Sequence, residues 1–216
     1  MKSIKNILLL IFIIFLLFEA VVYLYKNYET ENIEKRSNSK NETIFKRDYS
    51  FNFGENKKNL VVVQFIDPES YPSKQVYSII DKIHDKYNND INIVLKYLPT
   101  HKNSEEIIKI LEASRYQNKY KEALNIIFEK QDLWSAFNSE NPDLIWNFLK
   151  VIKNLDIKQL KIDKDNIEIK NIISQDKKDA KILKIDKSPV VYVNSKRLST
   201  LSYKELVLLI ENELKD

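Results

Sequence analysis

The chain has 216 residues, 44% of them hydrophobic and 11% aromatic, which is enough for one folded domain of ordinary size with an appendage. Its 35 basic and 31 acidic residues are interleaved along the chain, which argues against a nucleic-acid-binding face. The chain contains no cysteine, so disulfides, thiolate nucleophiles and cysteine-ligated metals are excluded. With one glycine and two histidines, it has neither a glycine-rich phosphate loop nor an HExxH-like zinc pair, and we expect no cofactor and no metal.

An apolar segment lies close to the N-terminus. Residues Ile7–Tyr25 are apolar apart from Glu19, and at 1.5 Å per residue they would form a helix of about 28 Å, enough to cross a bilayer. The alternative is a cleaved signal peptide, for which the small-x-small cleavage site is poor. Basic residues on the two flanks nearly balance, and an anchor with so short an N-terminal flank commonly leaves the long C-terminal part translocated. We therefore predict an anchor over residues 1–25, crossing the inner (cytoplasmic) membrane once, with the domain facing the periplasm or the cell exterior.

A polar segment and a folded domain follow the anchor. Residues 26–58 show no sustained periodicity and predict a tether, although Tyr49–Phe53 alternates and indicates a short first strand. The domain is expected over residues 59–216. It opens with the strand-like run Leu60–Ile66. The later predicted elements are, in chain order, a strand over Ile91–Leu98, a helix that Ser104 caps, helices over Tyr120–Lys130, Pro142–Asn154 and Ile167–Leu183, a strand over Val190–Val193, a segment Lys196–Leu198 and a helix over Ser202–Leu214.

The stretch Asp67–Ser73 joins the first buried strand to a helical pattern. Such a strand–turn–helix junction is where α/β folds often carry their chemistry. Ser70 suits the N-cap of the helix, and Pro72 suits its first turn because the missing N–H would be unpaired there anyway. The residue types at this junction are therefore explained by helix capping alone, before any functional role is considered.

Several motifs along the domain share their order and spacing with one known family. They are Phe65-Ile66-Asp67-Pro68-Glu69, Lys96-Tyr97-Leu98-Pro99-Thr100-His101, Ile110-Leu111-Glu112-Ala113, Gln131-Asp132-Leu133-Trp134, the stretch from Asp179-Ala180 to Val193-Asn194, and Ser188-Pro189-Val190 within it. Together they resemble the DsbA-type thiol-disulfide oxidoreductases, from Val61 to about Leu214. The resemblance implies an α/β, thioredoxin-like fold with a helical subdomain inserted over about residues 104–184.

The resemblance assigns the two redox cysteines of the family to Ser70 and Ser73. In that chemistry one thiolate, stabilised by a helix N-terminus, exchanges with a disulfide and the second thiol resolves the mixed disulfide. A serine hydroxyl stays protonated at neutral pH and forms no S–S bond. We therefore expect no catalytic residue and no redox cycle in the chain as it stands.

The resemblance also implies a peptide-binding surface that needs no thiol. In the family, the proline at the position of Pro189 is cis and faces the active turn, and the backbone before it, here Ser188, pairs with a bound peptide. Tyr71 and Pro72 would form the neighbouring apolar wall. The leading hypothesis is a membrane-tethered, redox-inactive protein that binds a polypeptide or partner protein outside the cytoplasm.

Three alternatives remain open at this point. One is a thiol-disulfide oxidoreductase whose Cys-x-x-Cys has been changed to Ser-x-x-Ser in this chain. A second is a serine hydrolase in which His101, at the exit of the second strand, activates Ser70, although no G-x-S-x-G elbow is present. A third is a structural subunit of a membrane complex, with the anchor helix as the main contact.

Overall fold

The computed structural model describes residues 19–23, 43–87, 89–135 and 143–215. It divides into two units, Met1–Asp48 and Tyr49–Asp216. In the first unit residues 19–23 are helical, and the backbones of Thr43 and Lys46 exchange hydrogen bonds of 2.8 and 3.0 Å. Within these described ranges, no helix has the length and apolarity that a membrane crossing requires. The predicted anchor, Ile7–Tyr25, lies outside those ranges except for residues 19–23.

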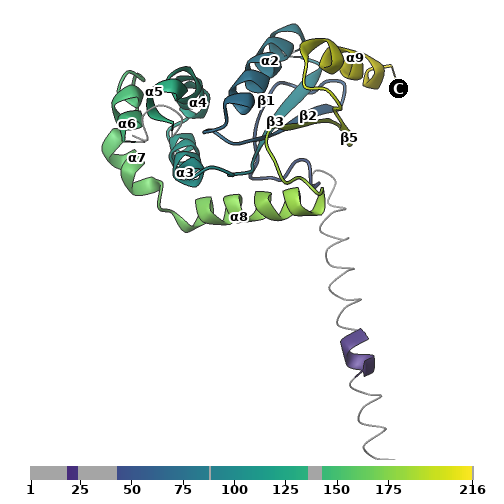
Figure 1. Cartoon of the computed structure of the whole chain (residues 1–216), viewed down its shortest axis with the longest axis horizontal. Coiled ribbons are helices and arrows are strands. Elements are labelled where there is room, and N and C mark those ends of the chain that lie inside the picture. The colour runs from purple at the N-terminus through teal and green to yellow at the C-terminus, as the bar shows by residue number, and fades with distance from the viewer. Residues whose placement is uncertain (1–18, 24–42, 88, 136–142, 216) are drawn as a thin grey trace, which may run out of the picture. The chain divides into compact units, whose positions relative to one another are not determined.

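A mixed sheet forms the centre of the second unit (Figure 1). Its strand order is β1-β3-β2-β4-β5, with β2 and β3 parallel and the other pairs antiparallel. The two parallel strands are buried almost throughout, which explains why both read as nearly continuous apolar runs rather than alternating patterns. The strands are β1 (Phe51–Phe53), β2 (Leu60–Ile66), β3 (Ile91–Tyr97), β4 (Val190–Val193) and β5 (Lys196–Arg197).

Helices cover both sides of this sheet. In Figure 1, α2 (Tyr71–Tyr87) and α9 (Tyr203–Glu213) lie above the sheet and contact each other, while α8 (Ile167–Ile182) lies below it and contacts β3. The inward face of α2 carries Val76, Ile80 and Ile83, all buried, at the spacing of one helical stripe. The βαβ unit of β2, α2 and β3 therefore forms as its sequence predicts.

The connection between β3 and β4 is a helical block. Trp134 is fully buried in it and donates its indole N–H to the carbonyl of Ile127 at 2.9 Å, so this tryptophan packs the helices together. The helices of the block that precede α8 are α3 (Ser104–Arg115), α4 (Tyr120–Glu129), α5 (Gln131–Trp134), α6 (Leu144–Leu149) and α7 (Ile157–Asp163).

The folded unit begins earlier than the sequence predicted. It starts at Tyr49, because β1 pairs with β3 and the ring of Phe51 stacks on Tyr120 with centroids 3.7 Å apart. After β1, Lys57 donates its N–H to the carbonyl of Asn89 at 2.9 Å. Residues 49–58, which were assigned to the tether, are thus part of the domain.

Two helical predictions also need correction. The helix expected over Pro142–Asn154 corresponds to α6, which ends at Leu149. The next helix, α7, was not predicted. Ser104 was expected to cap α3, but it is the first helical residue, and the cap position belongs to Asn103, which makes no side-chain capping bond. The Ser104 hydroxyl is used elsewhere, in the network around Asp67.

Candidate functional site

The turn between β2 and α2 is the candidate site, and Ser70 is the residue directly before α2. The Ser70 hydroxyl accepts a hydrogen bond from the N–H of Ser73 at 3.4 Å, and its carbonyl accepts one from the N–H of Lys74 at 3.2 Å. These are the bonds of an N-cap residue, so the predicted capping role is confirmed. The Ser70 side chain is buried, which leaves little of its hydroxyl for solvent.

Ser73, the second serine of the motif, ties the start of α2 to the end of β2. It is completely buried, and its hydroxyl accepts a hydrogen bond from the N–H of Asp67 at 3.1 Å. Its carbonyl accepts another from the side-chain amide of Gln64 at 3.1 Å. Both bonds join the helix to the strand before the turn, so Ser73 acts here as a structural hydrogen-bonding residue.

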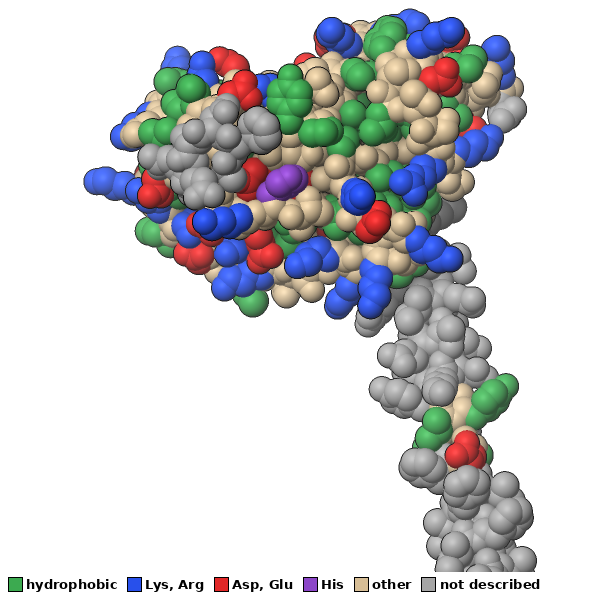
Figure 2. All heavy atoms as spheres, in the orientation of Figure 1, with side chains coloured by type: hydrophobic (Ala, Val, Ile, Leu, Met, Phe, Trp, Pro, Cys, Tyr) green, Lys and Arg blue, Asp and Glu red, His purple; other side chains and the backbone are tan. Residues whose placement is uncertain are grey.

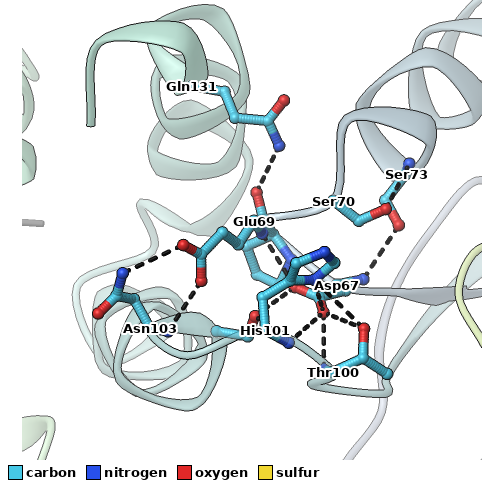
Figure 3. A network of polar contacts seen from close by, with 10 residues as sticks. Asp67, Glu69, Ser70, Ser73, Thr100, His101, Asn103 and Gln131 are labelled. Carbon is cyan, nitrogen blue, oxygen red and sulfur yellow. Dashed lines mark hydrogen bonds and ion pairs between the residues drawn. The ribbon is translucent and has the colours of Figure 1, made fainter. Parts of the chain in front are cut away.

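Asp67 is the centre of a polar network that the sequence did not reveal (Figure 3). Its buried carboxylate accepts hydrogen bonds from the Glu69 N–H and the Ser104 hydroxyl on one oxygen. The other oxygen accepts from the N–H and hydroxyl of Thr100, both at 2.7 Å, and from the N–H and ring Nδ1 of His101 at 3.2 and 2.8 Å. Burial raises the pKa of Asp67, but the hydrogen bonds from Ser104, His101 and Thr100 outweigh burial and hold it below its usual value.

The same turn is held from the helical block. Glu69 is buried, and its carboxylate accepts hydrogen bonds from the backbone N–H of Asn103 at 2.8 Å and from the side-chain amide of Asn103 at 3.1 Å. The side-chain amide of Gln131 donates to the carbonyl of Pro68 at 2.7 Å (Figure 3). The turn is therefore fixed by α2 behind it, by the residues after β3 and by α5.

Beside this turn, Lys96 on β3 is buried between two carboxylates. The register places Lys96 opposite Phe65, and its amine forms ion pairs of 2.7 Å each with Asp176 and Asp179 of α8. Burial raises the pKa of Asp176, and the charge of Lys96 opposes that rise. A lysine inside a buried, mostly apolar strand is a sequence signal for such a cluster, since buried lysines need partners.

The peptide bond between Ser188 and Pro189 is cis, as the family resemblance implied. Antiparallel pairing puts Val190 opposite Phe65, so Pro189 adjoins the end of β2 where the turn begins. Pro189 is buried and Ser188 is half-buried. Among the described residues the buried Ser188 hydroxyl has no hydrogen-bond partner, and the Ser188 backbone bonds to no other backbone group.

Tyr71 and Pro72 lie on the outer side of the first turn of α2. Tyr71 is 54% exposed and Pro72 is also exposed. The amine of Lys74 lies 5.8 Å from the centre of the Tyr71 ring. The structure thus exposes the apolar surface of the first turn and buries both serines beneath it.

The serine hydrolase alternative does not fit this geometry. The Nδ1 atom of His101 contacts Asp67 at 2.8 Å, while the Ser70 hydroxyl accepts the N–H of Ser73. Across the described part of the chain, no hydrogen bond joins Ser70 to His101. A nucleophilic serine needs a base within hydrogen-bond reach, and among the described residues the structure shows no such pair at Ser70.

Comparison with known proteins identifies the family to which this fold belongs. The sequence profile described as Thioredoxin matches residues 46–212. The chain belongs to the thioredoxin family. Solved structures of DsbA-like proteins share its fold, and no curated protein matches it.

Three solved structures show the extent of the likeness. A thioredoxin-like oxidoreductase from Silicibacter pomeroyi is 18% identical, with a TM-score of 0.69 over 80% of this chain and 96% of that one. BdbD from Bacillus subtilis is 21% identical, with a TM-score of 0.67 over 78% and 94%. The alpha-DsbA1 protein of Wolbachia pipientis is 15% identical, with a TM-score of 0.69 over 79% and 94%. At these identities the comparisons show the fold.

The DsbA-like fold is thus present without its reactive atoms. The chain has no cysteine anywhere, so this thioredoxin-like protein is not a redox-active Cys-x-x-Cys oxidoreductase. What the site contains is a fixed turn, an exposed aromatic residue on a helix N-terminus, and a backbone segment at Ser188 and the cis Pro189 that adjoins the end of β2. Without a thiol, that set of groups cannot exchange disulfides.

Proposed function

We propose that this protein is a membrane-tethered, redox-inactive DsbA-like protein that binds an extended polypeptide segment outside the cytoplasm. The segment would pair with the backbone of Ser188, beside Pro189, and rest its side chains on Tyr71 and Pro72. Main-chain pairing of this kind supplies affinity without requiring one particular ligand sequence.

The observation that carries the proposal is that polar groups of Ser188 lack hydrogen-bond partners among the described residues. Its hydroxyl is buried without a partner among the described residues, and its backbone bonds to no described backbone group. Buried or half-buried polar groups are normally satisfied, because leaving one unpaired costs about 1–3 kcal/mol. A bound polypeptide would supply the missing donors and acceptors.

The proposed location has two supports. The apolar run Ile7–Tyr25 is long enough for one membrane crossing. Among the structural relatives, a thioredoxin-like protein of Salmonella enterica is described as periplasmic, with a TM-score of 0.66 to this chain. A domain tethered on the outer side of the membrane would meet polypeptides that have just been translocated.

The test is binding of an unfolded polypeptide to the full chain in a non-ionic detergent. The probe is a reduced, carboxymethylated model polypeptide, which has no free thiol and stays unfolded. Tyr71→Ala should weaken binding about fivefold or more, because exposed aromatic anchors contribute on the order of 1 kcal/mol or more to such interfaces. Tyr116→Ala is the matched control, since Tyr116 is 48% exposed at the C-terminal end of α3 and should change nothing.

A second variant addresses the backbone itself. Pro189→Ala should also weaken capture, because proline fixes the conformation of the segment that presents Ser188. Thermal unfolding of each variant shows whether the fold is retained. Binding that is equal for the unchanged protein, Tyr71→Ala and a folded Pro189→Ala would refute the proposed site.

A further inference from the structure

A groove on α8 is separate from the turn described above. Its volume is about 420 Å³, and Ile173, which is buried, forms part of its lining. The N-terminal turn of α3 contributes Glu105 to one edge. A groove of this size is within the range that binds small ligands or short chain segments.

The groove is strongly cationic. Lys170, Lys177, Lys178 and Lys181 line it against a single acidic residue, Glu105. Lys177 lies 3.8 Å from that carboxylate. Across the ranges that the structure describes, the other three lysines form no ion pair. Figure 2 shows Lys and Arg side chains gathered along the lower edge of the folded unit, over α8.

The lysines are spaced along one side of the helix. At 100° per residue, Lys170, Lys177 and Lys181 fall on one stripe, with Lys178 at its margin. At 1.5 Å per residue the row is about 16 Å long, and Lys177 and Lys181 are about 6 Å apart along the axis. An extended chain repeats its side chains on one face at nearly the same interval, roughly 6.6 Å.

We propose that this groove binds an extended acidic polypeptide segment with carboxylates on alternate residues. The carboxylates would face the groove and pair with the lysine amines, with their methylene stems against Ile173 and the apolar lysine stems, while the small side chains between them would point away from the groove. A single inorganic anion would leave most of a row about 16 Å long unpaired. A lipid surface is broad and flat, and it would not enter a recess that has Ile173 in its lining.

The site does not depend on peptide binding at Ser188. Lys181 precedes Ser188 by seven residues in the chain, and the intervening Lys184 and Lys187 are exposed. The two sites are therefore joined by a short stretch of chain but bind through different groups. The groove would use lysine amines, and the Ser188 site would use backbone atoms. Each can be disabled without altering the other.

The test is fluorescence anisotropy with the full chain in a non-ionic detergent and a labelled octapeptide of alternating Glu and Thr. We expect saturable binding that weakens as salt is raised from about 0.02 to about 0.3 M, since exposed ion pairs are screened. Lys178→Gln with Lys181→Gln should weaken it about tenfold, because two of the amines that pair with the peptide carboxylates are removed. Lys82→Gln with Lys204→Gln removes the same charge from exposed positions elsewhere and should have little effect. Glu105→Gln should strengthen binding, because the one competing carboxylate is gone.

Further probes distinguish the alternating acidic peptide from other candidate ligands of the groove. A Glu₄Thr₄ block peptide should bind more weakly than the alternating one, and Gln-Thr peptide should not bind. Equal weakening in both double-lysine variants, or equal binding of the block peptide, would overturn the proposal. So would full displacement by millimolar inorganic phosphate, or binding to vesicles rich in phosphatidylserine but not to the peptide. Circular dichroism of each variant confirms that the helices are retained.

Discussion

The hydroxyl of Ser73 accepts a hydrogen bond from the backbone N–H of Asp67 at 3.1 Å, inside the protein. A thiol would be a much weaker acceptor, so the serine contributes a stronger hydrogen bond to the fold at the position where the family resemblance implies the second cysteine. Whether this position carries a hydroxyl or a thiol therefore affects the stability of the turn as well as its reactivity.

Ser73→Ala should lower the free energy of unfolding by about 1–3 kcal/mol, because it leaves the Asp67 N–H buried without an acceptor. Urea denaturation followed by tryptophan fluorescence measures the change. Ser78→Ala, on an exposed position of the same helix, should cost far less. Similar small losses of unfolding free energy in both variants would show that the buried hydrogen bond of Ser73 stabilises the protein no more than the exposed one of Ser78.

Asp67→Asn should destabilise the protein by about 2 kcal/mol at pH 7, because the charge-assisted bonds to Thr100, His101 and Ser104 weaken. The folded pKa of Asp67 lies below its usual 3.8, so its contribution is present above pH 3.8 and is lost as the pH falls through the folded pKa. The gap between protein and variant should therefore close under acid conditions. Urea unfolding from pH 7 to pH 3 measures it, and Asp186→Asn, an exposed aspartate, should show no such gap.

Lys96→Met should be the most damaging of these substitutions, at about 3–5 kcal/mol at pH 7, since it leaves Asp176 and Asp179 buried without a cation. The folded pKa of Asp176 is already raised above 3.8, so on acidification the folded state binds that proton before the unfolded state does. The cost should therefore fall as the pH is lowered from 7 toward 4. Adding Asp176→Asn and Asp179→Asn to Lys96→Met should recover much of the stability. Failure of the triple variant to recover would mean that shape, not charge, dominates the cluster.

Ser70→Cys with Ser73→Cys should form an intramolecular disulfide on mild oxidation, because residues three apart at a helix start have Cα atoms about 5–6 Å apart. Mass spectrometry before and after reduction detects the loss of two hydrogens. The control is Ser70→Cys with Ser78→Cys, where a rise of about 12 Å along the helix prevents bridging. If the first variant keeps a free dithiol under conditions that oxidise model dithiols, the geometry of this turn differs from that of the disulfide-forming turn in the family.

The sequence predicted the sheet and the order of elements well because each depends on local patterns. β2 and β4 have the predicted bounds, and the apolar stripe of α2 is buried as its spacing indicates. The break between α6 and α7 was missed, although Asp156 carries a capping signal. Its side chain accepts bonds from the N–H groups of Lys158 and Gln159.

The contacts of the site were harder to predict because they join residues far apart in the chain. Asp67 meets His101 across 34 positions, and Lys96 meets Asp179 across 83. Parallel strands bring their carboxyl ends to one edge, which explains why the residues after β2 and β3 converge. Periodicity could indicate that Lys96 needed a partner, but only the packing of α8 against β3 shows which residues supply it.

Ser70 and Ser73, which the family resemblance assigns to the positions of the two redox cysteines, also bear on how long the proposed complex would last. A thiol-bearing relative can hold its client in a mixed disulfide that persists until a second thiol attacks it. Because this chain has no cysteine, release of the polypeptide that we propose it binds would depend on dissociation alone, and the residence time would be set by the number and strength of non-covalent contacts. Shifts in the ambient glutathione poise would leave it unchanged.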